Sequence, residues 1–179
     1  MADLTKRLAR LRVPLGFAFA FVVLWFAHPS GRTLLAGGVV AVIGEALRVW
    51  AAGHLNKSRE VTASGPYRFF AHPLYVGSSV MGGGLAIASG SVVVAANIAL
   101  YLGATIKAAI SSEEAFLRST FGSEYDSYRR GEIGVRDTAA STRAFSVAQA
   151  MANREYRAVA GLVATIVVLT LKALYWAGH

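Results

Sequence analysis

The chain has 179 residues, a mass of 18.9 kDa and a formal net charge of +8. Hydrophobic residues make up 55% of it and charged residues only 16%, against roughly 25% in an average soluble domain, so the composition excludes an ordinary soluble protein. Long apolar runs predict instead an all-α polytopic membrane protein with a single domain over residues 1–179. Basic residues flank these runs, which favours contact with the lipid bilayer over contact with nucleic acid.

The first predicted elements lie at the N-terminus. Residues 1–12 are basic, with leucines at helical spacing, and form either a short interfacial helix or a plain basic flank. Residues 13–27 are uncharged and predict a first membrane span. After a turn over residues 28–31, residues 33–52 predict a second span.

The second predicted span contains two ionisable residues, Glu45 and Arg48, three positions apart on one helical face. Charged groups inside a membrane are costly, and they are usually paired or functional. The two residues are therefore either a structural ion pair or candidates for binding the substrate.

A helical hairpin is predicted next. Residues 53–71 form a polar loop, and Pro73 suits the first turn of a helix that has His72 near its N-cap. The third span covers residues 74–88 and includes three consecutive glycines, which favour close helix packing or a bend. A three-residue turn then returns the chain through a fourth span, residues 92–109.

The remaining elements are polar except for the last one. We expect an amphipathic helix over residues 113–130, a loop over 136–142, a second surface helix over 144–156 and a final span over about residues 159–176. Positive charge gathers at the N-terminus, in the loop 53–71 and in the segment 111–157. About five transmembrane helices with a cytoplasmic N-terminus fit this distribution.

This topology predicts a cofactor site at the cytoplasmic face. The hairpin brings the loop before the third span and the residues after the fourth span to the same face, so His72, Tyr75 and Glu113 are predicted to share a pocket. A carboxylate holds ribose hydroxyl or amino groups, and tyrosine faces suit a cation or a purine. By themselves, these residues also suggest a helix cap, interfacial aromatic residues and a solvated helix start.

Two motifs in order make the prediction more specific. Gly65-Pro-Tyr67 is followed by His72-Pro-Leu-Tyr75-Val-Gly77, and after the hairpin come Glu113-Glu114 and Phe121-Gly-Ser-Glu-Tyr125-Asp-Ser-Tyr128. Over residues 52–130 the chain resembles the isoprenylcysteine carboxyl methyltransferase and phospholipid methyltransferase superfamily. These are integral membrane enzymes that use S-adenosyl-L-methionine.

The resemblance implies a set of residues that bind this cofactor, with Tyr125 and Tyr128 packing to close the site. The implied cofactor-binding residues are Arg59, Glu60, Val61, Thr62, Gly65, Tyr67, His72, Pro73, Leu74, Tyr75 and Glu113. Ala109 stands where the prenylcysteine enzymes carry a substrate-linked arginine, and Lys107 is the candidate to replace it. Ala71 and the final span are further departures from the family pattern.

The predicted function is therefore S-adenosylmethionine-dependent methylation of a lipid-like or prenylated hydrophobic acceptor, without a metal ion. Carboxyl O-methylation fits better than amine methylation, because a carboxylate is already ionised near neutral pH and needs no general base. Three alternatives remain: N-methylation of a phospholipid amine, a nicotinamide-dependent membrane reductase, and a non-catalytic membrane scaffold.

Overall fold

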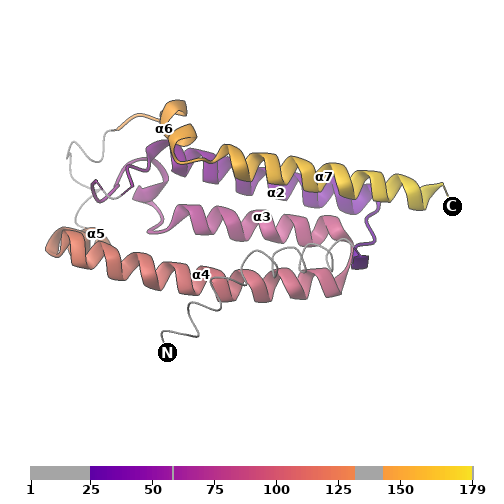
Figure 1. Cartoon of the computed structure of the whole chain (residues 1–179), viewed down its shortest axis with the longest axis horizontal. Coiled ribbons are helices and arrows are strands. Elements are labelled where there is room, and N and C mark those ends of the chain that lie inside the picture. The colour runs from indigo at the N-terminus through magenta and orange to yellow at the C-terminus, as the bar shows by residue number, and fades with distance from the viewer. Residues whose placement is uncertain (1–24, 58, 132–142, 179) are drawn as a thin grey trace.

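The computed structural model describes residues 25–57, 59–131 and 143–178, and these residues form helices and loops only. Figure 1 shows long helices lying side by side, with the short helical elements gathered at one end of the bundle. The long helices are α2 (Gly31–His54), α3 (Pro73–Ser89), α4 (Val92–Phe121) and α7 (Tyr156–Ala177). The short elements are the 3₁₀ turn η1 (Gly65–Arg68), α5 (Ser123–Arg129) and α6 (Val147–Ala152).

The tightest packing in the bundle is between α2 and α3, whose backbones touch at glycines. A Cβ atom on Gly44 would overlap the backbone nitrogen of Met81 and lie 2.7 Å from the carbonyl oxygen of Gly77. A Cβ atom on Gly84 would lie 2.6 Å from the carbonyl oxygen of Gly37. Small residues such as glycine let two helices approach closely inside a membrane, where the hydrophobic effect does not drive helices together. The α2–α3 pair is therefore the rigid centre of the fold.

The predicted hairpin is confirmed. Gly90 ends α3 in the left-handed conformation, with φ of 63°, and the Ser91 hydroxyl accepts a hydrogen bond from the backbone N–H of Val94 to cap α4. Gly84 packs on α2, whereas Gly82 packs on Leu102 of α4. Glycines of the predicted run therefore pack against two different helices, α2 and α4.

Three of the described helices, α2, α4 and α7, are long and apolar enough to cross a membrane. Their large apolar side chains point outward: Leu35, Leu100 and Leu171 are 72%, 74% and 62% exposed. Such surfaces suit lipid, and the chain is an all-α membrane protein. The 17 residues of α3 give a helix of about 26 Å, slightly short of a full span. The predicted N-terminal flank 1–12, the predicted first span up to residue 24 and the loop 136–142 lie outside the described residues, so the count of about five spans stays a prediction.

Two predicted boundaries differ from the structure. The fourth span and the first part of the predicted amphipathic helix 113–130 are one continuous helix, α4, which ends at Gly122, where φ is +51°. The sequence between them has no glycine or proline to stop a helix, so the polar residues simply extend the apolar helix beyond its membrane part. The rest of the predicted amphipathic helix is the separate helix α5. The predicted surface helix over residues 144–156 is shorter, because α6 covers only Val147–Ala152.

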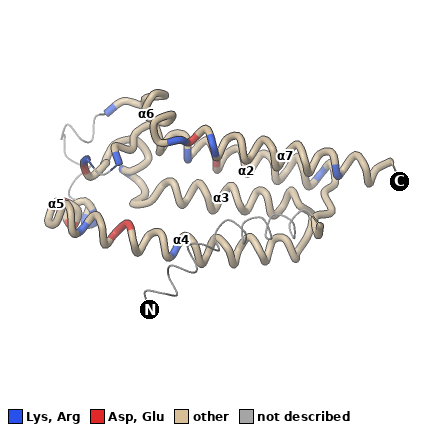
Figure 2. Tube along the Cα trace, in the orientation of Figure 1, with Lys and Arg blue, Asp and Glu red and all other residues tan. Residues whose placement is uncertain are grey.

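Charged residues of the described part of the chain gather toward the end of the bundle that carries α5 and α6, as Figure 2 shows. Helix α3 has no charged residue. Arg32 in the first turn of α2 and Lys172, whose Nζ donates a hydrogen bond to the carbonyl oxygen of Trp25, are exceptions that lie toward the other end. One end of the bundle is thus polar, and it contains both predicted motifs.

Candidate functional site

A cavity of about 580 Å³ opens at the polar end of the bundle, where the start of α3 faces the polar part of α4. Three stretches of chain build it: the loop after α2, the segment from η1 to the first turn of α3, and one face of α4, with one residue of α5. Its lining residues are Leu55, Lys57, Glu60, Val61, Thr62, Tyr67, Ala71, His72, Pro73, Leu74, Tyr75, Ala109, Ser112, Glu113, Phe116, Leu117 and Tyr128.

His72 lies between two carboxylates of α4. Its Nδ1 atom is 3.6 Å from Oε2 of Glu113, and its Nε2 atom is 3.2 Å from Oε1 of Glu114. The residue is the N-cap of α3, and Pro73 at the first helical position needs no hydrogen-bond acceptor. The sequence motif therefore fixes the imidazole at the helix start, and the hairpin delivers the carboxylates to both of its nitrogens.

The contact with Glu113, and then that with Glu114, raises the pKa of His72 above its usual value, although partial burial opposes the shift. When protonated, the imidazole neutralises part of the negative charge that the carboxylates bring to the cavity. Burial also raises the pKa of the Tyr67 phenol, so this side chain stays neutral and available as a hydrogen-bond donor. The ring of Tyr75 lies 5.9 Å from that of His72, centroid to centroid.

Helix α5 closes one side of the cavity. The hydroxyl of Tyr128 donates a hydrogen bond to the carbonyl oxygen of Tyr67 at 2.9 Å, and Nη2 of Arg129 lies 3.4 Å from Oε1 of Glu114. Tyr125 is 1% exposed beneath them. The second sequence motif thus packs directly on the first, across 61 residues of chain between Tyr67 and Tyr128.

Most of the predicted cofactor-binding residues line this cavity, but Arg59 and Gly65 do not. Gly65 supports it from behind: its φ is +56°, and a Cβ atom there would lie 2.6 Å from Nδ1 of the buried His54. Only glycine fits that conformation and that space, so the turn that orients Tyr67 depends on it.

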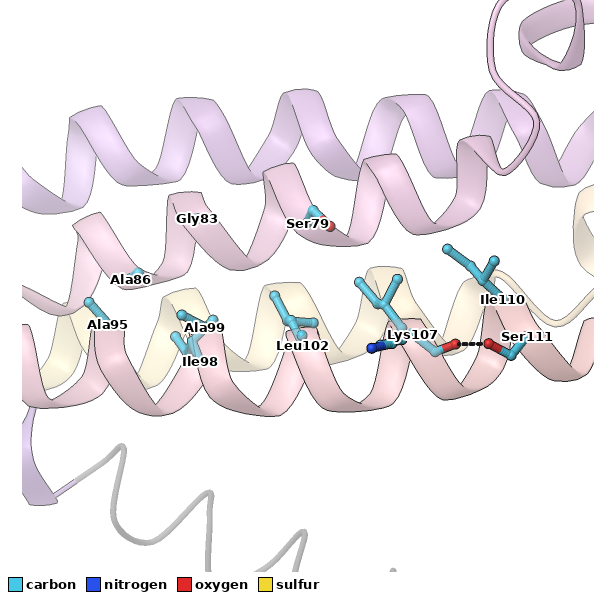
Figure 3. Close-up of a pocket in the computed structure, with 12 residues that line it drawn as sticks. Ser79, Gly83, Ala86, Ala95, Ile98, Ala99, Leu102, Lys107, Ile110 and Ser111 are labelled. Carbon is cyan, nitrogen blue, oxygen red and sulfur yellow. Dashed lines mark hydrogen bonds between the residues drawn. The ribbon is translucent and has the colours of Figure 1, made fainter.

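The predicted substrate-binding residues lie elsewhere. Glu45 and Arg48 are not among the residues lining the cavity; Nε of Arg48 is 3.4 Å from Oε2 of Glu45, and Nη2 of Arg48 is 2.7 Å from Oε1 of Glu155. Lys107 lines a second cavity of about 610 Å³, an apolar groove between α3 and α4. Figure 3 shows Lys107 one turn before Ser111, whose hydroxyl donates a hydrogen bond to the backbone carbonyl oxygen of Lys107, toward one end of that groove.

Several lining residues were missed by the sequence reading. Ala109, Ser112, Phe116 and Leu117 lie four before, one before, three after and four after Glu113, so helical spacing from that carboxylate would have found most of them. Leu55 and Lys57 have no comparable signal, because they follow the end of α2 in an irregular loop. Tyr128 was expected to pack around the site, and it also lines the cavity.

Comparison with known proteins identifies one family. The model of the phospholipid methyltransferase family matches residues 32–124, which cover α2, α3 and α4 and most of the cavity lining. A curated relative, the nickel-cobalt-cadmium resistance protein NccN of Alcaligenes xylosoxydans xylosoxydans, is 36% identical over 108 residues, covering 59% of this chain and 49% of that protein. The chain thus spans about half the length of this relative.

No solved structure matches the chain. The family match covers just over half of the sequence, and it includes the His72 and Glu113 motifs that meet in the cavity. The chain belongs to the phospholipid methyltransferase family of membrane proteins.

Proposed function

We propose that the protein is a membrane methyltransferase that binds S-adenosyl-L-methionine in the 580 Å³ cavity. The observation that carries this proposal is the meeting of His72, Glu113 and two tyrosines from separate parts of the family-matched segment around one cavity. In this proposal Glu113 accepts hydrogen bonds from the ribose or the amino group, because a carboxylate is the strongest acceptor in the lining. Tyr67 and Tyr75 contact the sulfonium or the adenine.

The chemistry asked of the protein is modest. Methyl transfer from a sulfonium is an in-line displacement: the bond from the acceptor to the methyl carbon forms as the carbon–sulfur bond breaks, and the sulfur keeps the electron pair. The protein has to align the two reactants and exclude water. A carboxylate acceptor needs no base, whereas the family match favours a phospholipid amine, which must first lose a proton. The proposal therefore keeps both a carboxylate and an amine as possible methyl acceptors, on a lipid-borne substrate.

The groove between α3 and α4 supports an acceptor that enters from the bilayer. A Cβ atom on Gly83 or on Gly103 would meet nothing within 4 Å, so these two glycines leave the groove open instead of tightening a helix contact. The walls are apolar, and Lys107 lies at the end nearer to Glu113. In our proposal an acyl or prenyl chain lies in this groove, and Lys107 pairs with an anionic group near the reacting end.

We also propose that the site faces the cytoplasm. The polar end of the bundle carries basic residues in the loop after α2 and around α5, including Lys57, Arg59, Arg118 and Arg129. Lysine and arginine accumulate on the cytoplasmic side of membrane proteins. A water-soluble cofactor then enters from the cytoplasm.

Calorimetry on the protein in detergent tests the proposed cofactor. We expect S-adenosylmethionine and S-adenosylhomocysteine to bind with micromolar dissociation constants, and reduced nicotinamide dinucleotides to give no binding heat. Binding of the nicotinamide instead would support a membrane reductase, and binding of none of these compounds would favour a scaffold. Methyl-labelled cofactor added to membranes then separates the two acceptors, because alkali releases label from a methyl ester and not from a methylated amine.

Filling the groove tests the acceptor path. Gly103→Leu is expected to lower labelling of the lipid fraction by about tenfold or more, because a leucine side chain occupies the space proposed for the lipid chain, and tenfold corresponds to only about 1.4 kcal/mol. S-adenosylhomocysteine affinity should not change. The matched control is Gly161→Leu on α7, where a Cβ atom also meets nothing within 4 Å. Equal labelling by both variants would remove the groove from the proposal.

A further inference from the structure

A short C-terminal segment, residues 143–155, packs against the polar end of α2. It contains α6 and lies outside the family-matched residues 32–124. The Ser146 N–H donates a hydrogen bond to the carbonyl oxygen of Gly53 at 3.1 Å, and the Phe145 ring lies beside the same glycine. None of these residues lines the cofactor cavity, yet the segment reaches the α2 end from which one cavity wall starts.

The segment caps the last turn of α2 from nearly 100 positions away in the sequence. Nε2 of Gln149 donates to the carbonyl oxygen of Leu55 at 2.8 Å, and Nδ2 of Asn153 donates to the carbonyl oxygens of Ala52 and Leu55 at 2.8 and 2.9 Å. The last carbonyls of a helix have no partner within it, so these amides satisfy groups that would otherwise be left open. Leu55 lines the cavity, so these hydrogen bonds fix the backbone of a lining residue.

The same segment reaches another part of the cavity lining through Arg48. Oε1 of Glu155 lies 2.7 Å from Nη2 of Arg48, and the guanidinium also donates hydrogen bonds to the Ser78 hydroxyl and, at 3.5 Å, to the carbonyl oxygen of Leu74. Leu74 lines the cavity next to His72. Glu155 is 7% exposed, and a buried carboxylate needs such a partner.

The turn after α6 directs the side chains of Asn153 and Glu155 toward α2. Arg154 has φ of +60°, the backbone N–H of Arg154 bonds to Met151, and that of Glu155 bonds to Ala150. This is the Schellman arrangement that ends a helix with a left-handed residue. Asn153 and Glu155 stand on either side of Arg154 in the sequence. Because the turn is tight, both side chains contact α2 or the residue at its end.

We infer that residues 143–155 act as a positioning element for the cofactor cavity, holding its Leu55 wall through Gln149 and Asn153 and its Leu74 wall through Glu155 and Arg48. The inference rests on the proposed function of that cavity. No residue of the segment touches the cofactor in this role. The segment sets the separation of two walls that belong to different helices.

The test is a double variant, Gln149→Ala with Asn153→Ala, in the full-length protein. We expect its dissociation constant for S-adenosylhomocysteine to rise about fivefold to thirtyfold, because the variant removes both side-chain hydrogen bonds that hold the Leu55 carbonyl. The KM for S-adenosylmethionine in membrane labelling should rise similarly, with little change in kcat. Met151→Ala, an exposed position of the same helix, is the matched control and should leave both quantities unchanged.

Three outcomes separate the possibilities. A folded, monodisperse double variant with wild-type affinity, measured well below its melting temperature, would overturn the positioning role and leave only a structural one. If the double variant does not fold, Gln149→Ala alone keeps the Asn153 bonds and should still weaken binding by a few fold; unchanged affinity there counts equally against the inference. Failure of the wild-type protein to bind the cofactor would instead refute the proposed function itself.

Discussion

Glu113→Gln is expected to weaken the binding of S-adenosylhomocysteine by about tenfold to a hundredfold while the protein stays folded. A hydrogen bond to a charged group contributes about 1.5–3 kcal/mol, and the amide keeps the size of the side chain but not its charge. Glu113 lines the cavity and is 39% exposed at its side chain, and His72 keeps its contact with Glu114, so we expect the fold to tolerate the substitution. Calorimetry in detergent measures the change directly.

The control for this prediction is the same substitution at an exposed site of the neighbouring helix. Glu124→Gln on α5 changes the net charge identically, but Glu124 does not line the cavity. We expect Glu124→Gln to change the dissociation constant for S-adenosylhomocysteine by less than about twofold, because an exposed charge outside the cavity is screened by salt. His72→Ala should weaken binding as well, because His72 orients both carboxylates. Wild-type affinity in both Glu113→Gln and His72→Ala would remove the assigned site.

Gly44→Ala is expected to destabilise the bundle by about 1–3 kcal/mol or more, although alanine is the better helix former. The added methyl group would overlap the backbone nitrogen of Met81, and backbone atoms of a packed helix cannot move aside singly. The α2–α3 contact would have to open along its length. Since α3 starts at His72 and Pro73, the loss of stability should come with weaker cofactor binding.

The matched variant is Gly38→Ala in the same helix. A Cβ atom there would meet nothing within 4 Å, so the variant should gain up to about 1 kcal/mol from helix propensity. Thermal unfolding in detergent measures both variants, and at this chain length each kcal/mol shifts Tm by about 2–4 °C. A lower Tm for Gly44→Ala together with a higher Tm for Gly38→Ala would confirm the close contact between α2 and α3. Tm shifts of the same sign would contradict it.

The hairpin and its cap were predictable because local rules dictate them. Pro73 fits only the first turn of a helix, and Gly90 supplies the left-handed residue that ends α3. With the hairpin in place, His72 and the Glu113 end of α4 had to lie near each other. The helix boundary inside the polar stretch was harder, since α4 continues to Phe121 with no break in propensity where its apolar part ends.

The separation of Lys107 from the cavity also follows from helix geometry. Lys107 and Glu113 are six residues apart on α4, which is about 240° around a helix with 3.6 residues per turn. They therefore face different neighbours, the apolar groove and the cofactor cavity. The sequence reading gave Lys107 a substrate role, and its place in the groove leaves that role as a proposal about the lipid end.

The sequence by itself determined the membrane class, the hairpin, and the pairing of the His72 and Glu113 motifs, because composition, glycine, proline and helical period act over short distances. Only the tertiary structure revealed that α3 packs mainly on α2, and that Asn153 and Glu155 reach the cavity walls from the C-terminal segment. The contacts of Asn153 and Glu155 join residues about 100 positions apart, and no local pattern encodes which carbonyl or guanidinium a distant side chain will meet.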